Sequence, residues 1–306
     1  MFYTCLLLKA GSFCEGGRFS PKVLRWACRI ISIMIRKLLS ALIVVLAVAR
    51  FLPAQEPKPI QDNSFLIEEA YNQEKGVVQH INAFAYFAES RDWFYTFTQE
   101  WPVPGDARHQ FSYTLAVVRP GDSNGPGFGD VSLNYRYQLV GSGTARVAFA
   151  PRLSVILPTG DTRWGRGFGG TGVQTNLPLS VVVNRKLATH WNAGATFLPN
   201  SQDAAGNRAS TAGYNLGQSF IWLAYPRVNF MLETVFSSAQ EVVAKDKTVW
   251  SNALLLNPGV RWAYNFKNGV QIVPGVAMPL GVGPSAGEKG FFLYLSFEHP
   301  FERLDK

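Results

Sequence analysis

Four histidines are the side chains of this 306-residue chain best suited to bind a metal or act as a general base: His80, His109, His190 and His299. A metal site or a catalytic triad needs such residues to converge, usually with recognisable spacing. These four fall on separate segments, and no cysteine follows residue 28 to join them. The sequence therefore predicts no metal and no cofactor at these histidines. In the barrel predicted below they would be ordinary residues of the lumen or the rim.

Several glycine-rich stretches resemble functional motifs without completing them. In "GDSNG" (121–125), Ser123 sits in a turn like that of outer-membrane phospholipases, but Gly121 stands where those enzymes carry histidine. "GRGFGG" (165–170) has the spacing of a dinucleotide loop, yet a strand pattern follows it instead of the required helix. Four turn aspartates lack the spacing of a calcium loop: Asp122, Asp130, Asp161 and Asp203. We expect no enzyme here.

The remaining chemistry is electrostatic and lies on the polar faces of expected strands. If those faces line a lumen, seven charged or titratable residues point inward: Arg136, Arg146, Arg152, His190, Glu233, Arg261 and Glu298. The three arginines nearest in sequence would share one wall, and the two glutamates could oppose Arg261. Such a set either forms a constriction that selects anions or polar groups, or braces the barrel as a salt-bridge network.

A second candidate site is the tip of the glycine-rich loop 157–172. It carries Arg163, Trp164, Arg166 and Phe168. We expect a flexible outer loop whose tip folds into a pore or touches lipopolysaccharide phosphates.

These residues must be positioned by strands, because the chain alternates apolar and polar residues from residue 77 onward. In 131–139, "VSLNYRYQL", every odd position is apolar or aromatic and every even position is polar. Segments of about ten residues repeat this habit between turn residues. Twelve are expected: 77–87, 92–102, 109–119, 129–140, 144–158, 172–184, 187–198, 213–225, 227–237, 248–264, 268–280 and 289–299. Segment 213–225 is the poorest, since Gln218 shares the aromatic face.

Three features favour lipid against the apolar faces. The segments are long enough for a tilted crossing of a bilayer, whereas sandwich strands are shorter. Aromatic residues gather near segment ends, as with Trp93 and Trp101 or Trp250 and Trp262. Tight turns alternate with long loops, which fall mostly on one rim. The fold predicted is all-β: a transmembrane antiparallel up-and-down barrel of about twelve strands, with ten or fourteen as the expected errors. A secreted soluble β-sandwich is the alternative.

The N-terminal region has the residue pattern of an export signal. Residues 1–33 read as a non-native upstream extension, and 34–55 as a signal peptide with a basic start, an apolar run and cleavage near Ala54 and Gln55. Residues 56–76 would be a periplasmic segment with a short helix over 65–72, either a floppy tail or a plug. The barrel would span 77–301, followed by a tail at 302–306.

The positive charge belongs to this leader. Of 29 Lys and Arg residues, eight lie within 1–55, and of 21 Asp and Glu residues only one does, which leaves 21 basic and 20 acidic residues from 56 onward. No basic stripe remains there for phosphates, so no nucleic acid partner is expected.

Four stretches carry resemblances to known proteins. The end of the chain, "EKGFFLYLSFEHPF", is similar to the terminal signal that the barrel-insertion machinery reads in outer-membrane proteins. "FGDVSLNYRYQL" (128–139), "RLSVILPTGD" (152–161) and "NLPLSVVVN" (176–184) together resemble the outer-membrane family associated with the meta-pathway of phenol degradation, over about residues 80–300. The resemblance implies a transporter-like barrel for small molecules, with aromatic ones among the candidates, and supplies no catalytic residues.

The sequence thus predicts a Gram-negative outer-membrane barrel, exported through a cleaved signal peptide. Its expected task is a narrow, porin-like channel or transporter for small molecules, of aromatic or hydrophobic kind, in contact with membrane lipid and lipopolysaccharide. An outer-membrane enzyme or a purely structural barrel remains the alternative function.

Overall fold

The computed structural model describes residues 60, 64–121, 123–143 and 145–300. The expected upstream extension, signal peptide, cleavage residues Ala54 and Gln55, and C-terminal tail lie outside these residues. None of the helical elements in the described residues is long and apolar enough to cross a bilayer.

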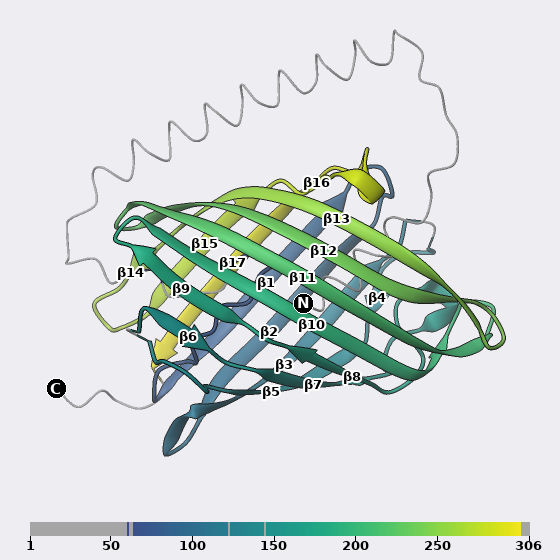
Figure 1. Ribbon diagram of the computed structural model, residues 1–306, viewed down its shortest axis with the longest axis horizontal. Helices are drawn as coiled ribbons and strands as arrows, with labels where there is room; N and C mark the ends of the chain where they lie inside the picture. The colour runs from purple at the N-terminus through teal and green to yellow at the C-terminus, as the bar shows by residue number, and fades with distance from the viewer. Residues whose placement is uncertain (1–59, 61–63, 122, 144, 301–306) are drawn as a thin grey trace, which may run out of the picture. The chain divides into compact units, whose positions relative to one another are not determined.

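The alternating segments form strands of one antiparallel sheet that closes on itself (Figure 1). Two short 3₁₀ helices, η1 (Thr162–Trp164) and η2 (Gly283–Ser285), lie in its loops. The strands are β1 (Val77–Phe87), β2 (Trp93–Val103), β3 (Asp106–Arg119), β4 (Gly127–Phe128), β5 (Val131–Tyr137), β6 (Val147–Phe149), β7 (Arg152–Leu157), β8 (Gly172–Asn176), β9 (Leu179–Asn184), β10 (Leu187–Gln202), β11 (Arg208–Tyr225), β12 (Val228–Ala244), β13 (Lys247–Trp262), β14 (Tyr264–Asn265), β15 (Gln271–Ala277), β16 (Leu280–Gly281) and β17 (Gly290–Pro300).

Interruptions divide some wall strands into pieces. Pro151 separates β6 from β7, and Pro178 separates β8 from β9, because proline has no N–H to give to the ladder. Counted as continuous crossings, the pieces form twelve strands, and β1 pairs with β17 from Val77 opposite Pro300 to Phe87 opposite Gly290. The predicted twelve-stranded closed barrel is confirmed, and the two-sheet sandwich is wrong.

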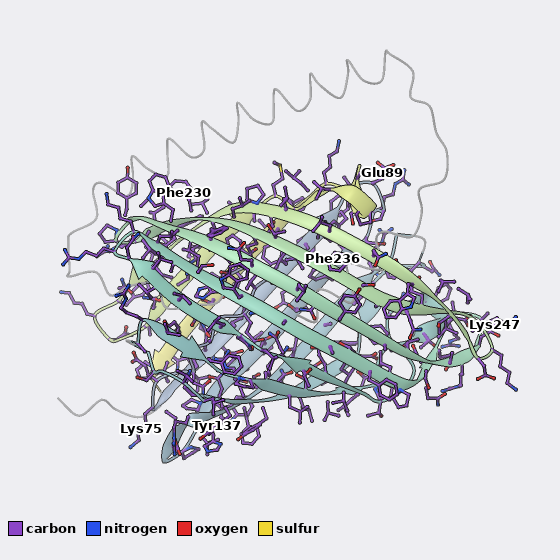
Figure 2. The ribbon with its side chains drawn as sticks, viewed as in Figure 1. Lys75, Glu89, Tyr137, Phe230, Phe236 and Lys247 are labelled. Atoms are coloured by element: carbon purple, nitrogen blue, oxygen red, sulfur yellow. The ribbon has the colours of Figure 1, made fainter. Side chains whose placement is uncertain are left out.

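The exposure of the side chains on each strand face shows which side of the wall is apolar. On β5, Leu133 is 49% exposed while Ser132, Asn134 and Arg136 between its apolar residues are buried. Phe236 lies on the outside of the wall, whereas Lys75, Glu89 and Lys247 lie toward its ends (Figure 2). The apolar side chains therefore cover the exterior and the polar ones fill the interior, as in membrane barrels. Gln218 follows its aromatic neighbours outward, where it hydrogen-bonds Thr189 at 3.4 Å.

The two ends of the barrel differ. The terminal rim holds both barrel ends, Val77 and Pro300, and tight turns such as 185–186 and 226–227. The opposite end, the loop rim, holds the longest connections of the described chain, 158–171 (the long loop) and 278–289.

The helix predicted over 65–72 is wrong. Residues 64–73, the lumen segment, contain only bends, and nearly all of its side chains are buried. A helix would consume its backbone N–H groups internally; here side chains of the barrel wall accept them instead.

Candidate functional site

The lumen segment is held inside the barrel by hydrogen bonds to the wall. Without a neighbouring strand, its N–H groups must find other acceptors, since buried backbone donors are almost always paired. Polar side chains from five wall strands, and Gln138 just after β5, supply partners. The backbone bonds are Leu66 N and Ile67 N to Glu233 Oε1 (2.9 and 3.1 Å), Glu68 N to Asn192 Oδ1 (2.9 Å), Ala70 N to Ser180 Oγ (2.8 Å), Asn72 N to Gln138 Oε1 (2.8 Å) and Gln73 N to Gln110 Oε1 (2.7 Å); in addition, Ser64 Oγ donates to Ser219 Oγ (2.8 Å).

A charge cluster anchors the middle of the segment. The Glu68 carboxylate lies 3.2 Å from Arg136 Nη1 and 3.0 Å from Arg152 Nε, and Asn176 Nδ2 donates to it at 2.7 Å. Glu100 on β2 lies 3.8 Å from Arg136. All four ionisable side chains are at least 87% buried, so the two arginines are balanced by two glutamates within the lumen.

Arg136 also binds the backbone of the segment. Its guanidinium donates to the carbonyls of Glu69 (3.1 Å) and Tyr71 (2.7 Å) and to Asn72 Oδ1 (2.9 Å). The planar fork of an arginine suits several acceptors at fixed angles. This one side chain therefore stabilises the conformation of residues 68–72.

Apolar packing anchors the beginning of the segment. The Phe65 ring contacts Phe292 and Tyr294 on β17, with ring centroids 5.6 and 5.5 Å apart. A Cβ on Gly259 or Gly275 would overlap this ring. These glycines make the recess in the wall that the ring fills.

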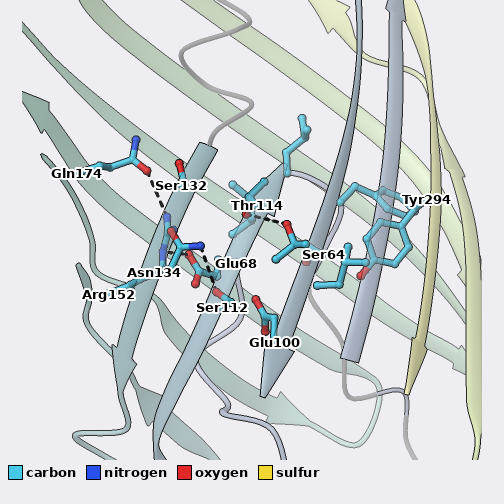
Figure 3. Close-up of a pocket in the computed structure, with 15 residues that line it drawn as sticks. Ser64, Glu68, Glu100, Ser112, Thr114, Ser132, Asn134, Arg152, Gln174 and Tyr294 are labelled. Atoms are coloured by element: carbon cyan, nitrogen blue, oxygen red, sulfur yellow. Dashed lines mark hydrogen bonds and ion pairs between the residues drawn. The ribbon is translucent and has the colours of Figure 1, made fainter. Parts of the chain in front are cut away.

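A small cavity remains beside the segment (Figure 3). Its volume is about 80 Å³, enough for a few water molecules. One side is polar and the other is formed by Phe65, Leu66, Ile81 and Tyr294. The polar side contains Glu68, Glu100, Ser112, Thr114, Ser132, Asn134, Arg152 and Gln174. Ser132 Oγ is buried and has no hydrogen-bond partner among the described residues.

The structure brings some predicted lumen residues together and separates others. Arg136 and Arg152 lie opposite each other on β5 and β7 and share Glu68. Arg146 does not join them. It precedes β6 at the terminal rim, is exposed, and donates to the carbonyl of Val183 (3.0 Å), because the strand that should carry it inward starts only at Val147.

The other four predicted lumen residues lie on three parts of the wall. Glu233 and Arg261 are inward-facing and buried on β12 and β13, and Glu298 is on β17 near the terminal rim. His190 Nδ1 lies 2.7 Å from Ser180 Oγ. This is the kind of hydroxyl–imidazole contact that an enzyme would need, but the same oxygen accepts the N–H of Ala70 and so serves to hold the lumen segment.

The long loop is organised by Asp130, which the sequence placed only in a turn. Its carboxylate accepts the N–H groups of Gly160 and Phe168, both at 2.8 Å. Arg166 Nη2 donates to the carbonyl of Gly125 (2.7 Å). This explains the aspartate of the "FGD" motif and the glycine of "LPTGD": together they pin the loop to the start of β5.

The four loop candidates range from exposed to half-buried. Arg163 is exposed and paired with Asp161 at 2.7 Å, and Trp164 is 42% exposed. Arg166 lies 5.9 Å over the Trp164 ring, and Phe168 is half-buried. The turn residue Ser123 donates to the carbonyl of Pro120, as expected of a plain turn.

Sequence reasoning missed most of the site. Glu68 lies within the helix predicted over 65–72, and the acceptors Gln110, Gln138 and Asn192 carry no motif. The one signal in the sequence was the row of amide and hydroxyl side chains on the polar faces, which supplies these partners. The structure also brings two histidines together, His80 and His299, against the expectation that all four stay apart.

Comparisons with known proteins place this geometry among outer-membrane barrels. No family model and no curated protein matches the sequence. Among solved structures, an outer-membrane channel from Pseudomonas putida F1 is similar over 80% of this chain and 99% of its own, with a TM-score of 0.50 and 16% identity. The fold is that of an outer-membrane β-barrel. NanC porin (TM-score 0.47, 10% identity, 72% of this chain and 98% of its own) and KdgM porin (0.44, 11%, 74% and 99%) are also similar.

Proposed function

We propose that this protein is a channel of the Gram-negative outer membrane that passes small solutes when the lumen segment moves aside. The observation that carries the proposal is the lumen itself. A polar interior surrounded by an apolar exterior is occupied by one segment of the chain, held by side chains of the wall, and the cavity beside this segment has a volume of only about 80 Å³.

The two interpretations of the arginine wall apply to two states of the channel. With the segment in place, Glu68 and Glu100 balance Arg136 and Arg152, and the cluster braces the lumen. When the segment leaves, Glu68 leaves with it. Two arginines then face one glutamate across a wet lumen, which favours anions and polar groups with negative partial charge.

The orientation follows from the rims. Outer-membrane barrels carry short turns on the periplasmic side and longer loops outside. The terminal rim would then face the periplasm and the long loop the cell exterior, where Arg163 and Trp164 are placed to meet lipopolysaccharide. Export through a signal peptide at 34–55, and recognition of the last strand by the insertion machinery, fit the same location.

The solute would be small and partly apolar. The cavity offers hydroxyls, amides, an arginine and two carboxylates on one side and aromatic and aliphatic carbon on the other. The resemblance of the "FGD" and "LPTGD" stretches to the meta-pathway family favours small aromatic molecules as cargo.

Planar bilayer recordings of protein extracted from outer membranes test the proposal. We expect discrete openings with preference for anions, and abolition of that preference when Arg136 and Arg152 are both replaced by glutamine. Stable insertion with no conductance at any applied voltage would leave the fold intact and overturn the channel.

A further inference from the structure

Two histidines meet where the barrel closes. His80 on β1 and His299 on β17 point to the outside of the wall near the terminal rim, and their Nε2 atoms are 3.1 Å apart. They come from strands 219 residues apart in sequence. In a barrel, the first and last strands become neighbours, so only closure creates this pair.

The spacing of the two nitrogens matches a chelate. A zinc–imidazole bond is about 2.05 Å long, so the N–metal–N angle at one ion bonded to both Nε2 atoms would be about 100°. This lies between the right angle of octahedral or square-planar ions and the tetrahedral angle. The distance between the two Nε2 atoms therefore already suits a shared ion, and only the rings would have to turn toward it.

The rings are also held in place. His80 stacks on Phe297, with centroids 4.5 Å apart, and on Phe97 at 5.9 Å. The Nδ1 atom of His299 lies 3.4 Å from the carbonyl of Pro300, to which it can donate. Donation from the second ring nitrogen to a carbonyl is how metal-ligating histidines usually fix their tautomer, since it leaves the Nε2 lone pair exposed.

The surroundings supply few further protein ligands. Gln99 lies opposite His80 in register, but its Oε1 accepts a hydrogen bond from Tyr113 at 2.7 Å. Both histidines are only partly buried. Water at the membrane interface can therefore complete the coordination of an ion.

We propose that His80 and His299 form a two-histidine site for a divalent transition metal ion such as Zn²⁺, Ni²⁺ or Cu²⁺, which clips the first strand of the barrel to the last. Imidazole is a preferred ligand of these ions. The unoccupied pair holds one shared hydrogen bond. Binding moves the remaining Nε2 proton to Nδ1 of the same ring, and both lone pairs then serve the metal.

The test uses full-length protein without a histidine tag, folded in detergent micelles, and ZnCl₂ as the probe. Calorimetry should find one site, and His80→Gln or His299→Gln should each weaken it about tenfold or more, as loss of one of two ligands requires. His109→Gln is the matched control, because His109 is another outward histidine near the same rim but contacts Tyr135 instead. It should bind zinc like the unmodified protein.

A second readout tests the clip. An ion that binds only the closed barrel stabilises it, so zinc should raise the unfolding midpoint of the unmodified protein and of His109→Gln, but not of the other two variants. Should those variants fail to fold, the Cu²⁺ electron paramagnetic resonance spectrum of the unmodified protein decides, since two equatorial imidazole nitrogens give a distinct hyperfine pattern. Absence of zinc binding below millimolar concentration, equal binding in all variants, or a copper spectrum with a single nitrogen overturns the proposal.

Discussion

Replacing Glu68 with glutamine should release the lumen segment. The change keeps the size and one acceptor oxygen of the side chain but removes its charge. Arg136 and Arg152 then remain buried beside a neutral amide, whereas in the released state they face a water-filled lumen. The substitution therefore weakens the docked state and leaves the released state almost unchanged.

The magnitude follows from the contacts. Removing one partner of a buried ion pair costs about 3–5 kcal/mol. Glu100, 3.8 Å from Arg136, and the retained amide oxygen offset part of this loss. The lower end, about 3 kcal/mol, corresponds to a roughly hundredfold rise in the ratio of released to docked segment.

Single-channel recording measures this ratio as open probability. We expect Glu68→Gln to open far more often than the unmodified channel at the same voltage. Glu89→Gln is the matched control, because it makes the same exchange at the exposed loop rim and should leave gating unchanged. Replacing Arg152 with methionine in the Glu68→Gln background should add less than the same replacement in the unmodified channel, since its charge partner is already gone. Unchanged open probability in a correctly folded Glu68→Gln barrel would refute the reasoning.

Three further outcomes are expected. Gly275→Ala places a methyl group against the Phe65 ring, and this overpacking costs about 1–3 kcal/mol. We expect open probability to rise about tenfold. In a Phe65→Ala background, where the ring is absent, the same substitution should leave open probability unchanged. Asp130→Asn removes a carboxylate that accepts two N–H groups, so hydrogen exchange in the long loop should accelerate about tenfold or more, with unaltered exchange as the contrary result. The hydrogen bond from Arg163 holds the pKa of the Asp161 carboxyl below its usual range. The stabilising contribution of this ion pair should therefore persist at neutral pH and be lost only as pH falls through the lowered pKa. Amide exchange of the η1 turn, measured against pH, tests this, and a loss of protection at the ordinary pKa of aspartate would contradict it.

The wall could be predicted from the sequence because its signal is local. Period-two alternation in 131–139, strand lengths near ten and aromatic residues at segment ends each concern neighbouring residues. Even the ambiguous segment 213–225 was placed correctly as a strand. Closure into a barrel follows because, in lipid, only a closed sheet gives the backbone N–H and C=O groups of every strand edge a hydrogen-bond partner.

The interior could not be predicted because its contacts are distant. Leu66 and Glu233 are 167 residues apart, and nothing near either residue marks the other. The sequence predicts a helix over 65–72, but the wall offers hydrogen-bond acceptors that no local pattern records. Arg136 and Arg152 lie opposite each other because adjacent strands fix their register. Arg146 stays outside their cluster because β6 begins only at Val147, whereas the strand expected from the sequence begins at 144.

A reversible tether between the lumen segment and the wall tests the central claim most directly. Ser64 and Ser219 have Oγ atoms 2.8 Å apart, and the chain has no cysteine from residue 56 onward, so Ser64→Cys with Ser219→Cys offers a unique pair there. With the disulfide formed, the conductance of the double variant should fall to the baseline, and it should return on reduction, while the unmodified channel ignores both treatments. Full conductance through a barrel whose cross-link is verified by mass spectrometry would show that solutes pass without displacement of the segment, and would contradict the account.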